Sequence, residues 1–309
     1  LHERFCRILA RELPSIGKGA RKQARRRVPR ETERDAEMKA GEWIRPGQGT
    51  VLAHDRVLRE AAGAQAVLLG ETHDRADNHR WQMHVAAGLL AHRRDIVLGF
   101  EMFPKRLNPV LAEWVAGGLD ETAFLERAEW GQVWGFAPEL YMPIFRFCRD
   151  FGIEMIGLNC RRGLVSEIGK DGWETTPTEL LEGLTPAAPA TPAYRRFLFE
   201  ITGGVREGRK AQSPQDPAFD RFVRAQQVWD RAFACRIAER CRQPDAPLVV
   251  GIIGRGHLEF RGGTPHQLND LGLERVSVLL PHDADRMTEA GQADAMCVMP
   301  ARQGIGKNG

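Results

Sequence analysis

Ala66–Asp74 reads Ala-Val-Leu-Leu-Gly-Glu-Thr-His-Asp, an apolar run that ends abruptly in a glycine, a carboxylate and an imidazole. The consecutive apolar residues predict a strand that is buried on both faces, as in parallel sheets covered by helices. The polar residues then stand at its carboxyl end, where open α/β sheets bind ligands. Glu71 and His73 are two positions apart, so in an extended chain they point to the same side. This pair is a candidate metal or acid–base site, unless Thr72 or Asp74 merely caps the next helix.

Further apolar segments along the chain predict strands of the same kind. They alternate with stretches of helical spacing, which favours a mostly parallel α/β sheet with helices on both faces. The predicted strands cover 66–71, 95–104, 153–158, 247–253 and 276–280, and we expect the last of these to close the sheet. Helices are expected over 52–62, 79–92 and 222–241, and from 264 onward.

The two ends of the chain differ in composition from its middle. Residues 1–45 are charged and Arg-rich, which predicts a helical or flexible basic arm, with a loop over 43–49 leading into the domain. The α/β domain is expected over 46–284. Within it, 172–217 is rich in Pro, Thr, Gly and Ala and predicts an insertion or lid with short helices. Residues 285–309 predict a polar, frayed tail.

Composition limits the classes of partner. The chain has 309 residues, 42% hydrophobic and 28% charged, as expected for a globular protein with a core. Its net charge of +3 reflects the cations between Lys18 and Arg30, so we expect no nucleic-acid partner. Six cysteines without a C-x-x-C pair indicate scattered reduced thiols. No apolar run approaches the ~20 residues that span a bilayer.

Several predicted strands end in side chains that can bind metals or exchange protons. Glu71 and His73 follow the first strand, Glu101 the second, Asn159 the third and His257 the fourth. Because parallel strands end at the same edge, we expect these side chains to meet. Two carboxylates and two imidazoles match the ligands of Mn, Co, Zn or Fe, with Asn159 as an orienting partner.

Other motif classes fit poorly. The turn Gly254-Arg255-Gly256-His257 is glycine-rich, but it lacks the G-x-G-x-x-G and G-K-[ST] patterns of nucleotide-binding loops. No G-x-S-x-G elbow of a serine hydrolase is present.

Several short motifs follow one another along the chain: Leu68–Asp74 with Asn78-His79-Arg80 and Gln82, Phe100–Phe103, Tyr141-Met142-Pro143, Leu158-Asn159, Ala225-Gln226 with Trp229-Asp230, and Gly254–His257. This ordered series, over roughly residues 43–282, resembles the ChaN-like family of haem-binding, iron-regulated proteins. The family is more distantly similar to the erythromycin-esterase (EreA) and Tiki protease superfamily, in which the equivalent Glu, His, Glu and His positions carry hydrolysis or bind metal.

The resemblance implies a haem-binding protein that serves iron or haem uptake or handling. Haem would be held at the C-terminal edge of the sheet, or across a homodimer in which porphyrins stack between subunits. It also implies a tyrosine as axial ligand, and tyrosinate is an accepted ligand of haem iron. The chain has only Tyr141 and Tyr194, and the resemblance leaves both open. His79, Asn159 and Arg255 are the further expected cofactor-binding residues.

Two further expectations concern location and an alternative function. The resemblance suggests a periplasmic or membrane-associated protein such as a lipoprotein. No signal segment stands at the start of this sequence, so we expect membrane association only if an anchor was lost from the N-terminus, and otherwise a cytoplasmic protein. The alternative function is a metal-dependent hydrolase of the esterase or peptidase type that uses Glu71, His73, Glu101 and His257.

Overall fold

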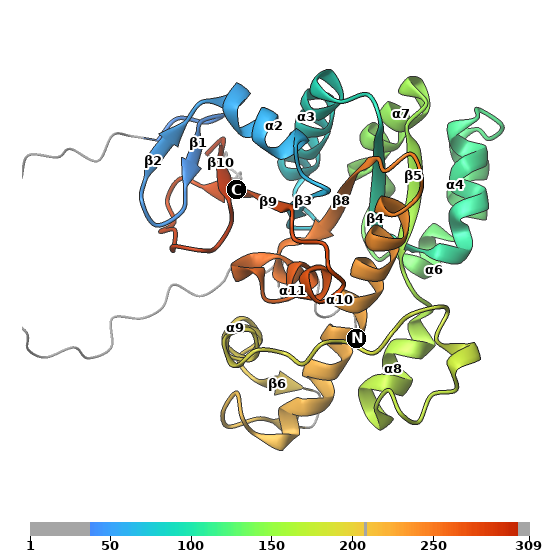
Figure 1. Cartoon of the computed structure of the whole chain (residues 1–309), viewed down its shortest axis with the longest axis vertical. Coiled ribbons are helices and arrows are strands. Elements are labelled where there is room, and N and C mark those ends of the chain that lie inside the picture. The colour runs from blue at the N-terminus through green and yellow to red at the C-terminus, as the bar shows by residue number, and fades with distance from the viewer. Residues whose placement is uncertain (1–37, 207–208, 302–309) are drawn as a thin grey trace, which may run out of the picture.

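The chain forms an α/β structure, seen in a computed structural model that describes residues 38–206 and 209–301. At its centre is a sheet of eight strands (Figure 1). The strands are β1 (Trp43–Arg45), β2 (Thr50–Leu52), β3 (Ala66–Glu71), β4 (Ile96–Pro104), β5 (Glu154–Asn159), β8 (Leu248–Gly254), β9 (Val276–Asp283) and β10 (Ala295–Met299). Their order across the sheet is β2-β1-β10-β9-β3-β8-β4-β5. All neighbours from β10 to β5 are parallel, whereas β1 pairs antiparallel with both β10 and β2.

Helices cover both faces of this sheet. The central strands are Val-, Ile- and Leu-rich and buried along their length, because each face packs against helices. One face is covered by α2 (His54–Ala62), α3 (Ala76–His92), α4 (Asn108–Val115), α5 (Glu121–Arg127), α6 (Trp130–Val133) and α7 (Met142–Phe151). The other is covered by α8 (Arg162–Asp171), α10 (Asp220–Cys241) and α11 (Thr264–Asp270). Short 3₁₀ helices are η1 (Lys105–Leu107), η2 (Pro138–Leu140), η3 (Thr178–Leu180), η4 (Pro217–Phe219), η5 (Arg255–His257) and η6 (Glu259–Arg261).

The predicted fold class is confirmed, and so are its main elements. The five expected strands correspond to β3, β4, β5, β8 and β9, and each starts within one residue of its expected position. The expected helices correspond to α2, α3, α10 and α11. Each of these segments has an apolar pattern that matches its burial. The long helix α10, for example, is buried over most of its length between α8, α11 and β5.

The sheet is wider than predicted at its β9 side. Residues 43–45, expected in the arm and its following loop, form strand β1 with buried Trp43 and Ile44. The expectation of a frayed polar tail is wrong for Ala295–Met299, which is the buried strand β10 and pairs with β9. Consequently β9 does not close the sheet but lies inside it. Both strands are short and flanked by polar and glycine residues, which hides their apolar pattern.

The segment 172–217 contains a helix and a small hairpin in place of a regular layer. Here α9 (Pro192–Thr202) precedes β6 (Val205–Arg206) and β7 (Arg209–Lys210), which pair antiparallel. Whether it acts as a lid stays a prediction. Most of the basic arm, 1–37, and the end of the tail, 302–309, lie outside the described residues. Among the described helices, none combines the length and apolar character needed to cross a membrane.

Candidate functional site

The carboxyl edge of the sheet brings the strand-end residues together, as the sequence predicts. Neighbouring strands β3, β8, β4 and β5 deliver Glu71, His257, Glu101 and Asn159 to this edge. Asn159 donates its amide N–H to the backbone carbonyl of Glu101, with 2.9 Å between nitrogen and oxygen. The side chains of Glu71, His73, Glu101 and His257 are all at most 2% exposed. The site is therefore a buried polar cluster within an apolar core.

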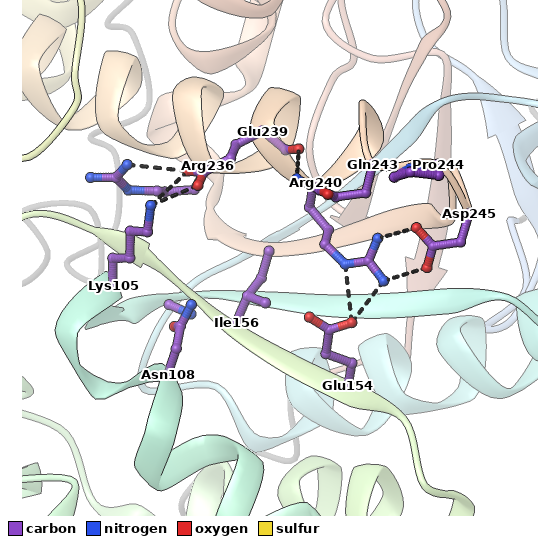
Figure 2. A pocket seen from close by; sticks show the side chains of 11 residues that line it. Lys105, Asn108, Glu154, Ile156, Arg236, Glu239, Arg240, Gln243, Pro244 and Asp245 are labelled. Carbon is purple, nitrogen blue, oxygen red and sulfur yellow. Dashed lines mark hydrogen bonds and ion pairs between the residues drawn. The ribbon is translucent and has the colours of Figure 1, made fainter.

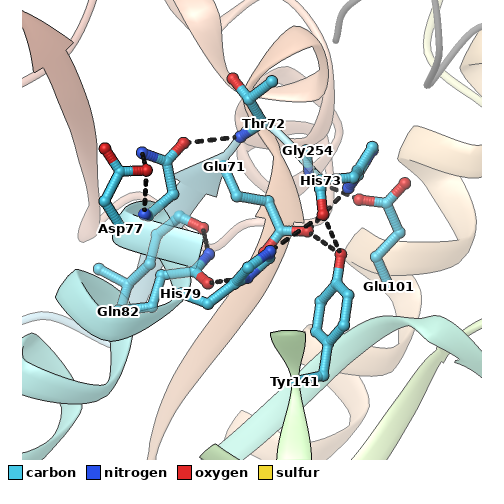
Figure 3. A network of polar contacts seen from close by, with 11 residues as sticks. Glu71, Thr72, His73, Asp77, His79, Gln82, Glu101, Tyr141 and Gly254 are labelled. Carbon is cyan, nitrogen blue, oxygen red and sulfur yellow. Dashed lines mark hydrogen bonds and ion pairs between the residues drawn. The ribbon is translucent and has the colours of Figure 1, made fainter. Parts of the chain in front are cut away.

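The first half of the cluster is a hydrogen-bonded chain of Tyr141, Glu71 and His73, here called the Tyr141 triad (Figure 3). The Tyr141 hydroxyl donates to Glu71 Oε1 at 2.7 Å, and the same oxygen lies 2.7 Å from His73 Nδ1. His79 lies beside it, with Nδ1 3.2 Å from Glu71 Oε2 and Nε2 3.0 Å from the His73 carbonyl. The three side chains around Glu71 thus fix both its carboxylate oxygens.

Charge in the Tyr141 triad follows from these contacts. Burial alone would raise the pKa of the Glu71 carboxyl, but the imidazoles of His79 and His73 outweigh burial and hold this pKa well below its ordinary value. Burial would likewise lower the pKa of His79, but the Glu71 carboxylate outweighs it and raises that pKa. Glu71 is therefore a buried carboxylate whose negative charge is stabilised by its imidazole neighbours.

The second half repeats this arrangement with Tyr194, Asp230 and His257, here called the Tyr194 triad. The Tyr194 hydroxyl donates to Asp230 Oδ2 at 2.8 Å, and His257 Nδ1 lies 2.9 Å from Asp230 Oδ1. Thr264 donates its hydroxyl to the same Oδ1 at 3.1 Å. Asp230 is fully buried in α10, so these donors satisfy a carboxylate that water does not reach.

Glu101 lies between the two triads. Its Oε2 accepts the backbone N–H of Gly254 at 2.5 Å, and its Oε1 is 3.9 Å from His257 Nε2. A Cβ atom added to Gly254 would lie 2.9 Å from His73 Cε1 and Nε2 and 3.3 Å from Glu101 Oε2. Gly254 therefore allows the His73 ring and Glu101 to approach the same point. In each triad the imidazole Nδ1 contacts a carboxylate, the arrangement that orients a ring for proton exchange at Nε2.

Both candidate axial tyrosines lie inside the hydrogen-bonded network. Tyr141 and Tyr194, the only tyrosines of the sequence, are 0% and 3% exposed, and each hydroxyl donates to a carboxylate. Burial and the adjacent Glu71 raise the pKa of Tyr141 well above its ordinary value, and burial and Asp230 do the same for Tyr194. Tyrosine binds haem iron as tyrosinate, so ligation by either residue would require its hydrogen bond to the carboxylate to break. The contacts therefore favour a structural role for both tyrosines, and the role of either as axial ligand stays a prediction.

The other expected cofactor-binding residues are also engaged within the protein. His79 is buried against Glu71, and Asn159 bonds the Glu101 backbone. Arg255, half-buried after β8, pairs through Nε with Glu259 Oε1 at 2.5 Å. All three side chains have partners within the protein, so binding a haem propionate would require each of them to leave its present partner.

The expected metal site is not supported by the arrangement of donors. Over residues 38–206 and 209–301, no group of three or more His, Cys, Asp or Glu side chains has the geometry to hold a metal ion. Glu71 contacts His73 Nδ1, and Asp230 contacts His257 Nδ1, so both carboxylates are engaged with imidazoles. The four residues do meet, but as a hydrogen-bonded network.

Sequence reasoning missed the role of Asp230, which joins His257 to Tyr194. One signal was present: an acid stands within the mostly apolar stripe of α10, next to Trp229. A buried carboxylate requires partners, so its position predicts a polar contact. His282, on β9, is a further buried polar residue and is 3% exposed.

Comparisons with known proteins agree with this architecture. The structure is similar to that of ChaN of Campylobacter jejuni, described with cofacial haem binding, with a TM-score of 0.68 at 16% identity over 85% of this chain and 98% of that one. It is less similar to the type III effector HopBA1, with a TM-score of 0.47 at 13% identity over 84% and 97% of the two chains. A mutant of erythromycin esterase EreC gives 0.45 at 12% identity over 77% and 76%. At these identities the likeness to ChaN shows the fold alone.

Sequence comparisons place the chain more specifically. No curated protein matches it. The family described as haem-binding uptake, Tiki superfamily, ChaN matches residues 57–268, which contain both triads and every strand from β3 to β8. This match extends over more than half of the sequence, and the chain therefore belongs to the ChaN family of the Tiki superfamily.

Proposed function

We propose that this protein binds haem and serves iron or haem uptake or handling, with an iron ligand other than tyrosine. The observation that carries the proposal is the family match over residues 57–268. The structure of a family relative described with cofacial haem shares the fold of this chain. Porphyrins held between two subunits require a homodimer, which forms part of the same proposal, as does a periplasmic or membrane-associated location.

Under this proposal, the axial ligand of the haem iron is a histidine imidazole. His84 is exposed on α3, and its ring lies 5.2 Å from that of His54. His54 Nδ1 accepts the indole N–H of Trp43 at 2.9 Å, so the proton of the neutral His54 ring is on Nε2. Neither nitrogen of His54 then has a free lone pair for binding a metal. His84 is therefore the first imidazole to test.

Titration of the purified protein with haemin, followed by the Soret band, tests the proposal. We expect a saturable Soret shift at micromolar protein, and light scattering should show a dimer in the haem-loaded sample. The matched variants are His84→Ala and His92→Ala, of which the first is expected to weaken binding. The absence of a saturable shift in the wild-type protein would overturn the proposal.

A second candidate function is hydrolysis by general acid–base catalysis. The specific observation is that two imidazoles, each with Nδ1 against a carboxylate, flank Glu101. In such a reaction His73 or His257 takes a proton from water as the water adds to an ester or amide carbonyl, and a proton is returned to the leaving group. Ester and peptide substrates tested with and without Mn, Co or Zn check this function. Equal rates of hydrolysis for the wild type and Glu101→Gln would exclude this function.

A further inference from the structure

A groove at the β5 edge of the sheet has opposite charges at its two ends (Figure 2). It lies between β5 and the C-terminal half of α10, away from both triads, and encloses about 530 Å³. This volume is within the range of small-molecule sites. None of the residues of the candidate functional site lines it.

One end of the groove has an excess of positive charge. Lys105 Nζ lies 2.7 Å from Glu239 Oε1, and Arg236 Nη1 lies 3.4 Å from Glu239 Oε2. Two cations therefore share one carboxylate among the lining residues. The Arg236 side chain is only 4% exposed, and its buried Nε has no hydrogen-bond partner in the described part of the chain. Because Arg236 lines this end of the groove, its positive charge adds to that of Lys105.

The other end has an excess of negative charge. Arg240 lies between two carboxylates, with Nη2 2.8 Å from Glu154 Oε2 and Nη1 2.7 Å from Asp245 Oδ1. Both carboxylates are about half exposed, so a ligand can reach them. Figure 2 shows the apolar side chain of Ile156 between the two ends.

The spacing of the ends sets the size of the ligand. Glu154 lies at the negative end of the groove, and Figure 2 shows Asn108 beside Lys105 at the positive end. Gly157 donates its backbone N–H to Asn108 Oδ1 at 2.8 Å, so it lies near the positive end, three strand residues or about 10 Å from Glu154. An extended tripeptide with free ends separates its charges by about the same length. A single amino acid is too short to reach both ends.

We propose that this groove binds the free ends of a short peptide of about three residues. Its α-ammonium group lies against Glu154 and Asp245, its α-carboxylate lies against Lys105 and Arg236, and its middle residue covers Ile156. The peptide then runs parallel to β5, which is the edge strand. This site is independent of haem binding.

Trialanine is the probe, and isothermal titration calorimetry with the full chain at low ionic strength is the measurement, because salt screens exposed charges. We expect saturable binding. N-acetyl-trialanine and trialanine amide, which each lack one end charge, should bind about tenfold more weakly. These capped peptides test both ends on the unaltered protein, so no result depends on a variant that fails to fold.

Two variants assign each end of the peptide to one end of the groove. Asp245→Asn should bind trialanine and its N-acetylated form equally, and Lys105→Gln should bind trialanine and its amide equally. Arg146→Gln, which removes an exposed ion pair with Glu121 on the opposite helix layer, is the matched control and should bind like wild type. Charges that only protect the sheet edge from pairing would give no saturable binding, or binding that neither cap changes, and either result overturns the proposal.

Discussion

Replacing Tyr141 by phenylalanine separates a structural role of this side chain from a role in haem ligation. The substitution removes only the hydroxyl, which donates to Glu71 Oε1 at 2.7 Å in a fully buried position. A hydrogen bond to a charged acceptor contributes about 1.5–3 kcal/mol. Glu71 keeps its contacts with His73 and His79, so we expect a loss of about 2 kcal/mol in the free energy of unfolding.

Urea unfolding followed by both far-UV circular dichroism and tryptophan fluorescence measures this loss, and coincident transitions justify a two-state treatment. The melting temperature should fall by roughly 4–8 °C. The same variant should keep the Soret band and the haemin affinity of the wild type, because the phenol is not available to iron. Tyr194→Phe, which loses a comparable bond to Asp230, is the parallel variant and should behave alike. Loss of the Soret shift in Tyr141→Phe with unchanged stability would refute the reasoning.

Three further predictions concern the same network. Gly254→Ala should lower the free energy of unfolding by about 1–3 kcal/mol, because the added Cβ would lie 2.9 Å from the His73 ring. Gly131→Ala is the control, because a Cβ added there meets nothing within 4 Å. Equal melting temperatures for the two variants would contradict the close approach at Gly254. Asp230→Asn replaces an acceptor of three buried donors, so urea unfolding should show a loss of about 3 kcal/mol, and a loss below about 1 kcal/mol would contradict the Tyr194 triad.

The third of these predictions concerns pH. The pKa of His79 is raised in the folded protein, so its contribution is complete below the ordinary value of 6.5 and is lost as pH rises through the folded pKa. The pKa of Glu71 is lowered, so its contribution is present above 4.5 and is lost as pH falls through the folded pKa. Urea titrations should show that stability falls more steeply above pH 6.5 in wild type than in His79→Gln. Parallel curves would contradict the pairing with Glu71.

The sequence was sufficient for the fold and for the location of the site because both depend on local patterns. Apolar runs such as the one in β3 end in polar residues, and parallel topology then places those ends at one edge. The strands β1 and β10 were missed because three- and five-residue strands have too few residues to show a period. They pair with each other between residues as far apart as Trp43 and Cys297, 254 positions along the chain, which local spacing does not report.

Pairing within the site was less predictable than its position, and the tyrosines show why. Composition reduces the candidate phenols to two, but it does not reveal whether a phenol faces solvent or a carboxylate. That depends on contacts between Tyr141 and Glu71, 70 positions apart, and between Tyr194 and Asp230, 36 positions apart. Each carboxylate must be satisfied once it is buried, and a tyrosine hydroxyl is a donor that remains protonated there. A phenol that donates to a carboxylate must give up that hydrogen bond before it binds iron as tyrosinate, so the two roles compete at one residue.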